Sequence, residues 1–172
     1  MGKIAVNFLV CLGCLALGTA EADALSLTSP AFSDSGIMPF NSGYRNGNVS
    51  PVLEWSDVPG NAEFFALVMD DPDARGWTHW VVFNIPGSVT ALGERFPKEG
   101  ELPDGTRQGK NDFGKLGYGG PSPPSGTHRY LFRLFALDSK IDLEPGISKA
   151  LLLKAMEGHI IGEAKLVGKY SK

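Results

Sequence analysis

Two histidines beside turn-forming segments are the residues of this sequence best suited to chemistry. His79 follows the turn Asp71-Pro72-Asp73, and His128 follows a glycine-rich segment at residues 117–121. Each histidine lies near the start of an apolar run typical of a β-strand. Two imidazoles and two carboxylates gathered at one rim of a β fold would form a binding site for a small polar ligand.

The chemistry that these residues favour is recognition of an anion. Pro72 directs Asp71 toward an extended conformation. A carboxylate there would accept a hydrogen bond from an imidazole and favour its charged form. Free backbone N–H groups of the glycine-rich turn at residues 117–120 would add donors, so phosphate or carboxylate is the expected ligand. If Asp71 supports a protonated histidine, anion affinity should strengthen as the pH falls toward the histidine range.

Strand alternation predicts which side chains share a face. It places His79 with Trp77, Val81 and Phe83, and it places His128 with residues such as Tyr130. The histidines would meet at one end of the sheet if their strands run in the same direction. The sequence leaves that pairing open.

The elements that must position these residues are short strands separated by turns. The chain holds 22 Gly and 12 Pro, which argues against a helical bundle. Strands are expected at residues 25–28, 51–55, 64–69, 77–85, 129–137 and 164–170, a long loop at 87–127, and a helix that starts after Pro145-Gly146-Ile147-Ser148 and covers 149–157. We therefore expect an all-β fold, an antiparallel β-sandwich with a C-terminal helix.

The first residues predict export. Lys3, an apolar run and the small residues before Ala22 form the pattern of a secretory signal peptide at residues 1–22, which leaves a single domain at 23–172. The protein is then periplasmic or secreted, and the run is too short for a stable membrane span. A lipoprotein with Cys14 lipidated fits poorly, because Cys11 stands where an aliphatic residue is wanted.

Composition limits the remaining function classes. Both cysteines lie in the leader, so the mature domain has no disulfide, thiolate nucleophile or cysteine-bound metal. A net charge of −3 with no long basic run argues against nucleic acid as a partner.

Two enzyme hypotheses remain as minor alternatives. Ser122 or Ser125 could act as a nucleophile with His128 as base and Asp71 as its orienting group, but nothing in the sequence positions either serine. A zinc site from both pocket histidines and a carboxylate lacks the short ligand spacings of strong metal motifs. Each candidate residue also has an ordinary structural interpretation, such as a core histidine or an Asx turn.

Several motifs, taken together and in this order, resemble the phosphatidylethanolamine-binding protein family, in particular its bacterial Raf-kinase-inhibitor-like branch. They are Asp71-Pro72-Asp73-Ala74, Trp77-x-His79-Trp80-Val81-Val82-x-Asn84-Ile85-Pro86, Asn111-Asp112-Phe113-Gly114, Gly117-Tyr118-Gly119-Gly120-Pro121-x-Pro123-Pro124-x-Gly126-x-His128-Arg129-Tyr130, and the closing Met156-Glu157-Gly158-His159 with Leu166-Val167-Gly168-x-Tyr170. They span nearly the whole mature chain.

The resemblance implies a non-catalytic module without cofactor or metal that takes phosphate or a phosphorylated head group. The ligand-binding residues it implies are Asp71, Asp73, Trp77, His79, Gly119, Gly120, Pro121, His128 and Tyr130. Some relatives restrain kinases or proteases. The alternative function is therefore an inhibitor of a protease or another extracytoplasmic enzyme, acting through the exposed segment 99–115.

The chain departs from the family pattern at two positions. Ser122 stands where many bacterial relatives carry Cys, so thiol chemistry is absent there. Arg75 stands where the family often has Pro, which would loosen the Asp-Pro-Asp turn or add a positive charge near the pocket.

Overall fold

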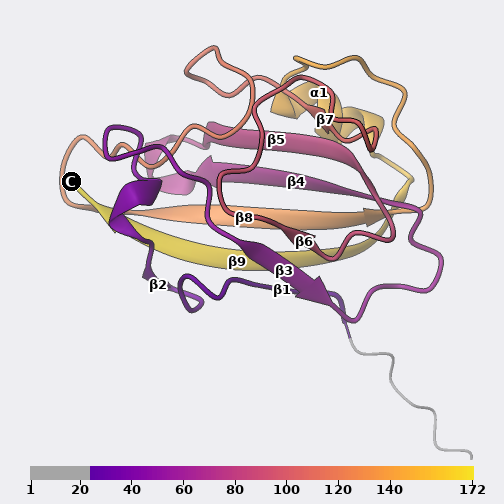
Figure 1. Ribbon diagram of the computed structural model, residues 1–172, viewed down its shortest axis with the longest axis horizontal. Coiled ribbons are helices and arrows are strands. Elements are labelled where there is room, and N and C mark those ends of the chain that lie inside the picture. Colours follow the sequence, from indigo (N-terminus) through magenta and orange to yellow (C-terminus); the bar gives the residue numbers. More distant parts are fainter. Residues whose placement is uncertain (1–23) are drawn as a thin grey trace, which may run out of the picture.

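The computed structural model describes residues 24–172, and the expected leader at 1–22 lies outside the described residues. Strands dominate this part of the chain (Figure 1). In chain order the elements are β1 (Ser26–Thr28), β2 (Gly36–Ile37), the 3-10 turn η1 (Phe40–Ser42), β3 (Leu53–Ser56), β4 (Phe64–Asp71), the 3-10 turn η2 (Pro72–Ala74), β5 (Trp77–Pro86), β6 (Ala91–Leu92), β7 (Arg107–Gln108), β8 (Thr127–Leu137), α1 (Lys149–Ala155) and β9 (Ile160–Ser171).

The strands form a six-stranded sheet and a three-stranded sheet. The large sheet has the order β2-β9-β8-β4-β5-β7, and the small sheet has the order β1-β3-β6. The pairs are antiparallel except that β2 runs parallel to β9, so the expectation of a purely antiparallel fold is wrong at that edge. Figure 1 shows β4, β5, β8 and β9 side by side as the long central strands.

The main core lies between the two sheets. Leu27, Leu53 and Trp55 of the small sheet share one buried cluster with residues of the large sheet such as Met69 and Phe132. Alternation along each strand supplies these inward side chains, because successive residues point to opposite faces. Burial of this apolar surface is the dominant stabilising contribution to the fold.

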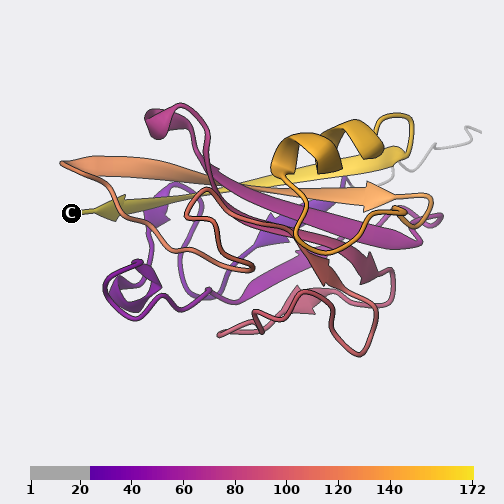
Figure 2. The same cartoon turned by 90° about the horizontal axis from the view of Figure 1, so that it is seen from above.

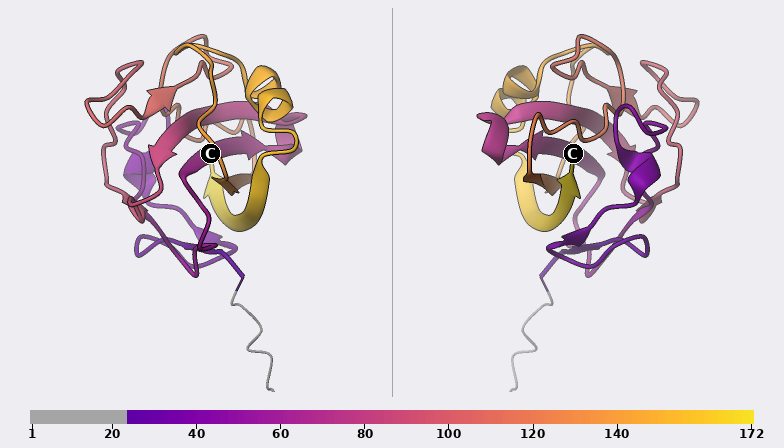
Figure 3. Two further views of the ribbon diagram at one scale, coloured as in Figure 1. Left: turned by 90° about the vertical axis from the view of Figure 1, so that its right-hand side faces the viewer. Right: turned by 90° about the vertical axis from the view of Figure 1, so that its left-hand side faces the viewer.

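A second cluster covers the other face of the large sheet. Leu152 of α1 and Met156, the residue after the helix, pack there against sheet residues such as Val68 and Val81. Figures 2 and 3 show α1 on the side of the large sheet away from β1 and β3. Within residues 24–172, no helix has the length and apolar character needed to cross a membrane.

The helix begins where the sequence predicts, because Ser148 caps it. The Ser148 hydroxyl accepts a hydrogen bond from the backbone N–H of Leu151 at 3.3 Å. The helix ends at Ala155, two residues before the expected end at Glu157. The last strand, β9, is longer than expected and covers Ile160–Ser171.

Candidate functional site

Both histidine segments lie at the same end of the large sheet. β4 pairs antiparallel with both β5 and β8, so β5 and β8 run in the same direction and begin at the same end. β4 ends there at Asp71. The two histidine strands are therefore not direct neighbours, and Asp71 lies on the strand between them (Figure 1).

A β-bulge changes the face on which His79 lies. Met69 pairs with Trp80 and Asp70 pairs with Thr78, so His79 is an extra residue in β5. An extra residue reverses the strand alternation on one side of the bulge. The imidazole packs edge-on against Tyr130, 5.1 Å between ring centroids, in the core between the sheets. Val81 lies in the outer cluster, so the predicted shared face of His79 and Val81 is wrong.

Asp71 closes a turn and orients His128 at the same time. Its Oδ1 accepts hydrogen bonds from the backbone N–H groups of Asp73 and Ala74, at 2.8 and 3.0 Å, and so caps η2. Its Oδ2 accepts a hydrogen bond from His128 Nδ1 at 2.7 Å. Only 2% of Asp71 is exposed, so these three bonds satisfy a buried carboxylate.

His79 is held by the glycine-rich segment. Its Nδ1 donates to the Gly119 carbonyl at 2.6 Å, and the Gly119 N–H donates to the His79 carbonyl at 2.8 Å. Burial lowers the pKa of His79, against opposing effects from the Gly119 carbonyl and from Asp71. The neutral ring then keeps its proton on Nδ1, and Nε2 has no hydrogen bond to the described residues.

A pocket of about 230 Å³ lies over these groups. Its lining residues are Asp71, Ala74, Trp77, His79, Phe113, Ser122 and Pro124. The Phe113 ring forms one wall, with centroids 5.6 Å from Trp77, 5.5 Å from His79 and 4.2 Å from the stacked ring of Tyr44. Two polar side chains on the sheet thus face a small cavity with mainly apolar walls, the usual composition of a ligand site.

Several expected site residues support the pocket without lining it. His128 bonds to Asp71 but does not line the pocket, and Tyr130 is fully buried with a hydroxyl that has no hydrogen-bond partner among residues 24–172. Burial raises the pKa of the Tyr130 phenol. Asp73 pairs with Arg129 at 2.6 Å, and these hydrogen bonds lower the pKa of Asp73 to about 2.

Gly119 and Gly120 do not offer the free donors that we expected. The Gly119 N–H is bonded to His79, and the Gly120 N–H donates to Asn48 Oδ1 at 2.7 Å. The Pro121 carbonyl accepts from the backbone of Tyr44 at 2.8 Å. A Cβ at Gly120 would overlap the Ser42 carbonyl, so glycine is required there for close loop contact.

Ala74, Ser122 and Pro124 line the pocket although they were not among the expected ligand-binding residues. The most consequential residue that sequence reasoning missed is Phe113, whose ring contacts both Trp77 and His79. Asn111 shapes its loop by donating to the Gly117 carbonyl and accepting from the backbone N–H groups of Phe113 and Lys115. Asp112 accepts from the Thr78 N–H at 2.7 Å, which ties this loop to β5. The sequence motif Asn111-Asp112-Phe113-Gly114 could have indicated this pocket wall. Because the motif lies far from both histidines in the sequence, its contribution to the pocket was not predicted.

The minor alternatives gain little from the geometry. Among residues 24–172, no hydrogen bond joins Ser122 or Ser125 to His128, although Ser122 lines the pocket. In the same residues, no group of three or more His, Cys, Asp or Glu side chains is arranged to hold a metal ion. His159 lies on the surface, where it contacts Asp138 at 3.0 Å.

Comparison with known proteins decides the family. The family model described as "Phosphatidylethanolamine-binding protein" matches residues 28–171. The chain belongs to the phosphatidylethanolamine-binding protein family. A UPF0098 protein of Methanothermobacter thermautotrophicus is 55% identical to this family member over 150 residues, covering 86% of this chain and 99% of the relative. Escherichia coli YbhB is 41% identical over 135 residues, covering 75% and 85% of the two chains.

Solved structures of the family share this fold. E. coli YbcL, titled a new member of the mammalian PEBP family, matches with a TM-score of 0.81 and 34% identity over 87% of this chain and 99% of that chain. CT736 of Chlamydia trachomatis, titled a putative PEBP homolog, matches with a TM-score of 0.79 and 39% identity over 87% and 98%. This family member is therefore of the bacterial YbhB type.

Proposed function

We propose that this protein is an exported, non-catalytic binding protein that holds phosphate or a phosphorylated head group in the pocket at His79 and Asp71. The observation that carries the proposal is the way in which the His79 side chain is held at the pocket. Its Nδ1 is fixed by a carbonyl, its backbone is fixed by Gly119, and the ring lines a small cavity. The leader pattern of residues 1–22 supports the export part of the proposal.

The proposal implies that a proton accompanies the anion. Neutral His79 would present an acceptor at Nε2, which repels an oxyanion unless one partner is protonated. Either His79 takes up a proton and donates to the ligand, or a protonated phosphate oxygen donates to Nε2. The phosphate of an esterified head group loses its last proton at a pH of about 6, so for such a ligand both routes consume a proton and affinity should increase as the pH falls below neutrality.

The surroundings support an anion despite the nearby carboxylate. Three hydrogen bonds already occupy Asp71, and one of them comes from His128. Trp77, Phe113 and Pro124 contribute apolar walls, and hydrogen bonds to a ligand are stronger in less polar surroundings. The two sheets would act as the layers of a β-sandwich that fixes the pocket floor, since residues of both share one core.

The test is an NMR titration of the purified protein with phosphate and then phosphoethanolamine at two pH values. We expect saturable amide shifts in segments 71–79 and 112–124 that are stronger at the lower pH. His79→Gln should abolish them, whereas the matched control His159→Gln, at a surface histidine, should retain them. Absence of shifts in the folded wild-type protein would overturn the proposal.

The inhibitor function remains the alternative proposal. The segment Pro103-Asp104 is exposed, while its base is held by the pair between Glu101 and Arg107 at 3.3 Å. An exposed turn with a supported base is suited to contact another protein. If the pocket binds no anion, substitution of Asp104 with loss of protease inhibition would favour this function.

A further inference from the structure

Exposed apolar side chains gather at the pocket end of the molecule, where β5 and β8 begin and β4 and β9 end. Of the five large apolar side chains exposed among residues 24–172, three lie there: Phe40 at 75%, Ile37 at 66% and Trp77 at 40%. Trp77 starts β5, and Ile37 lies in register with Lys169 near the end of β9. The Tyr170 hydroxyl donates to the Phe40 carbonyl at 2.8 Å, which places η1 at the same end. This grouping indicates an interaction surface.

The turn that carries Phe40 is fixed from the interior. Met38 and Ser42 are buried, and Met38 belongs to the main core. The N–H of Gly43 donates to the Phe40 carbonyl at 3.1 Å, and the N–H of Ser42 donates to the Pro39 carbonyl at 3.0 Å. The Phe40 side chain therefore stays in solvent although the residues on both sides of it are anchored. A turn that is already ordered in this way loses little entropy on binding.

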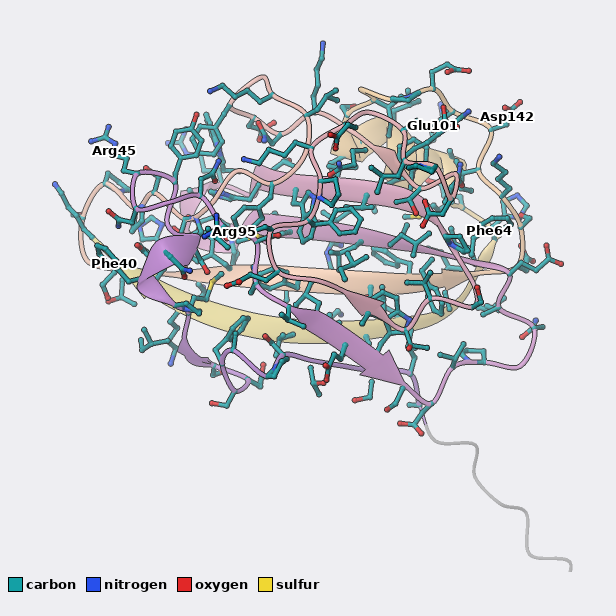
Figure 4. The ribbon with its side chains drawn as sticks, viewed as in Figure 1. Phe40, Arg45, Phe64, Arg95, Glu101 and Asp142 are labelled. Carbon is teal, nitrogen blue, oxygen red and sulfur yellow. The ribbon has the colours of Figure 1, made fainter. Side chains whose placement is uncertain are left out.

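Four cationic side chains without an ionic partner lie at the same end. Lys169 lies in the last part of β9, Arg75 follows η2, and Arg45 and Lys172 line one cavity beside the end of β9. No ion pair joins any of the four to another residue in the described part of the chain. Figure 4 shows Phe40 and Arg45 at this end, with the Arg45 side chain directed outward from its loop. Cationic and apolar groups are thus interspersed at one end of the molecule.

The carboxylates of this end already accept hydrogen bonds. Asp71 is buried, and Asp73 binds the Arg129 guanidinium at 2.6 Å. Asp34 and Asp112 accept from backbone N–H groups of β9 and β5, at 2.9 and 2.7 Å. The whole chain has a net charge of −3, but its pocket end presents four cations that pair with none of these carboxylates. The potential at this end is therefore more positive than the net charge suggests.

We propose that the pocket end is a docking surface for a lipid bilayer that contains anionic lipids. Phe40, Ile37 and Trp77 enter the interfacial region of the bilayer, where aromatic and aliphatic side chains next to polar groups are stable. Arg45 and Lys172 attract the anionic head groups. The inference goes beyond the proposed function and does not depend on it. Because Trp77 also lines the pocket, docking would bring the pocket close to the lipid head groups.

A bilayer fits this surface better than a protein partner does. The exposed apolar side chains come from three separate segments, β2, η1 and the start of β5, with cations between them. A fluid lipid surface can accept such separate side chains and the cations at the same time. A protein interface instead has a close-packed apolar centre from which charged residues are depleted.

Vesicle co-sedimentation provides the test, with phosphatidylcholine vesicles that either contain or lack phosphatidylglycerol. We expect the wild type to bind the anionic vesicles more tightly, and less so at high salt. Phe40→Ser should weaken this binding about 10-fold, and Arg45→Gln about 5-fold. The controls Ile160→Ser and Lys140→Gln replace exposed residues at the opposite end, where β9 begins and β8 has ended, and should bind like the wild type.

Tryptophan fluorescence gives a second readout, because Trp77 is exposed whereas Trp55 and Trp80 are buried. Anionic vesicles should shift the emission to shorter wavelength as Trp77 leaves water. Trp77→Phe should remove this shift, and Phe40→Ser should reduce it. An emission spectrum that bound vesicles leave unchanged would contradict the proposed orientation of the docking surface.

The outcomes separate this inference from the proposed function. All variants share residues 1–23, so differences between them report the described surface. Failure of the wild type to bind anionic vesicles, or binding that Phe40→Ser and Arg45→Gln leave unchanged, would overturn the docking surface. His79→Gln should still bind vesicles, and loss of binding in this variant alone would show capture of lipid by the pocket and overturn the inference. Failure of phosphate and phosphoethanolamine to bind would overturn only the proposed function.

Discussion

Replacement of Asp71 measures how much the pocket depends on one buried carboxylate. Asp71→Ala removes the acceptor for two backbone N–H groups of η2 and for His128. Loss of such a cap costs about 1 kcal/mol. Loss of a buried, charge-assisted hydrogen bond costs a further 1.5 to 3 kcal/mol, roughly. We therefore expect Asp71→Ala to lower the free energy of unfolding by about 2.5 to 4 kcal/mol.

Asp71→Asn is the matched control because it preserves shape and the capping oxygen. The side-chain amide would face His128 Nδ1, which must then change tautomer to accept a hydrogen bond. The decrease in the free energy of unfolding should then be only about 1 to 2 kcal/mol, because the η2 cap remains and only the charge-assisted part of the hydrogen bond to His128 is lost.

The assay is urea unfolding followed by circular dichroism and tryptophan fluorescence. The free energy of unfolding and its slope against urea concentration are compared among the variants. Nitrogen chemical shifts of His128 would report the tautomer directly, with the proton on Nδ1 in the wild type and on Nε2 in Asp71→Asn. The reasoning is refuted if Asp71→Ala costs less than about 1 kcal/mol, or if Asn and Ala cost the same.

Three further predictions concern the surroundings of the pocket. First, the pKa of His79 lies below its ordinary value of 6.5 because the ring is buried, so below pH 6.5 the unfolded chain binds more protons than the folded one. The unfolding free energy of the wild type should therefore fall relative to His79→Gln as the pH is lowered from about 7 to about 5, and parallel pH profiles would contradict this. Second, Gly120→Ala should destabilise by about 3 kcal/mol or prevent folding, because the new Cβ meets the Ser42 carbonyl; Gly60→Ala, with open space around it, should be nearly neutral in the same thermal melt. Third, Lys149→Met should cost about 1 to 2 kcal/mol and speed hydrogen exchange at Gly76, since Lys149 Nζ bonds Asp70 at 3.1 Å and the Gly76 carbonyl at 2.8 Å. The exposed Lys154→Met in the same helix should change neither quantity.

Local patterns account for the parts of the structure that could be predicted from sequence. The helix starts at Lys149 because the Ser148 hydroxyl accepts a hydrogen bond from the N–H of Leu151, only three residues away in the sequence. Strands β4, β5 and β8 follow from apolar, β-branched runs bounded by turn residues. The family follows from ordered motifs, and the family model confirms it. These features depend on neighbours in sequence, so the sequence by itself determined them.

Contacts between distant segments decided the rest. The bulge at His79 depends on the register between β4 and β5, which alternation within one strand cannot reveal. The N–H groups of Gly119 and Gly120 are occupied by His79 and Asn48, partners that lie far away in sequence. Phe113 reaches the pocket only because its loop bonds to β5. The sequence thus determined which polar residues are available, whereas pairing of strands and loops decided which of them line the pocket, because each such contact joins groups brought together only when the chain folds.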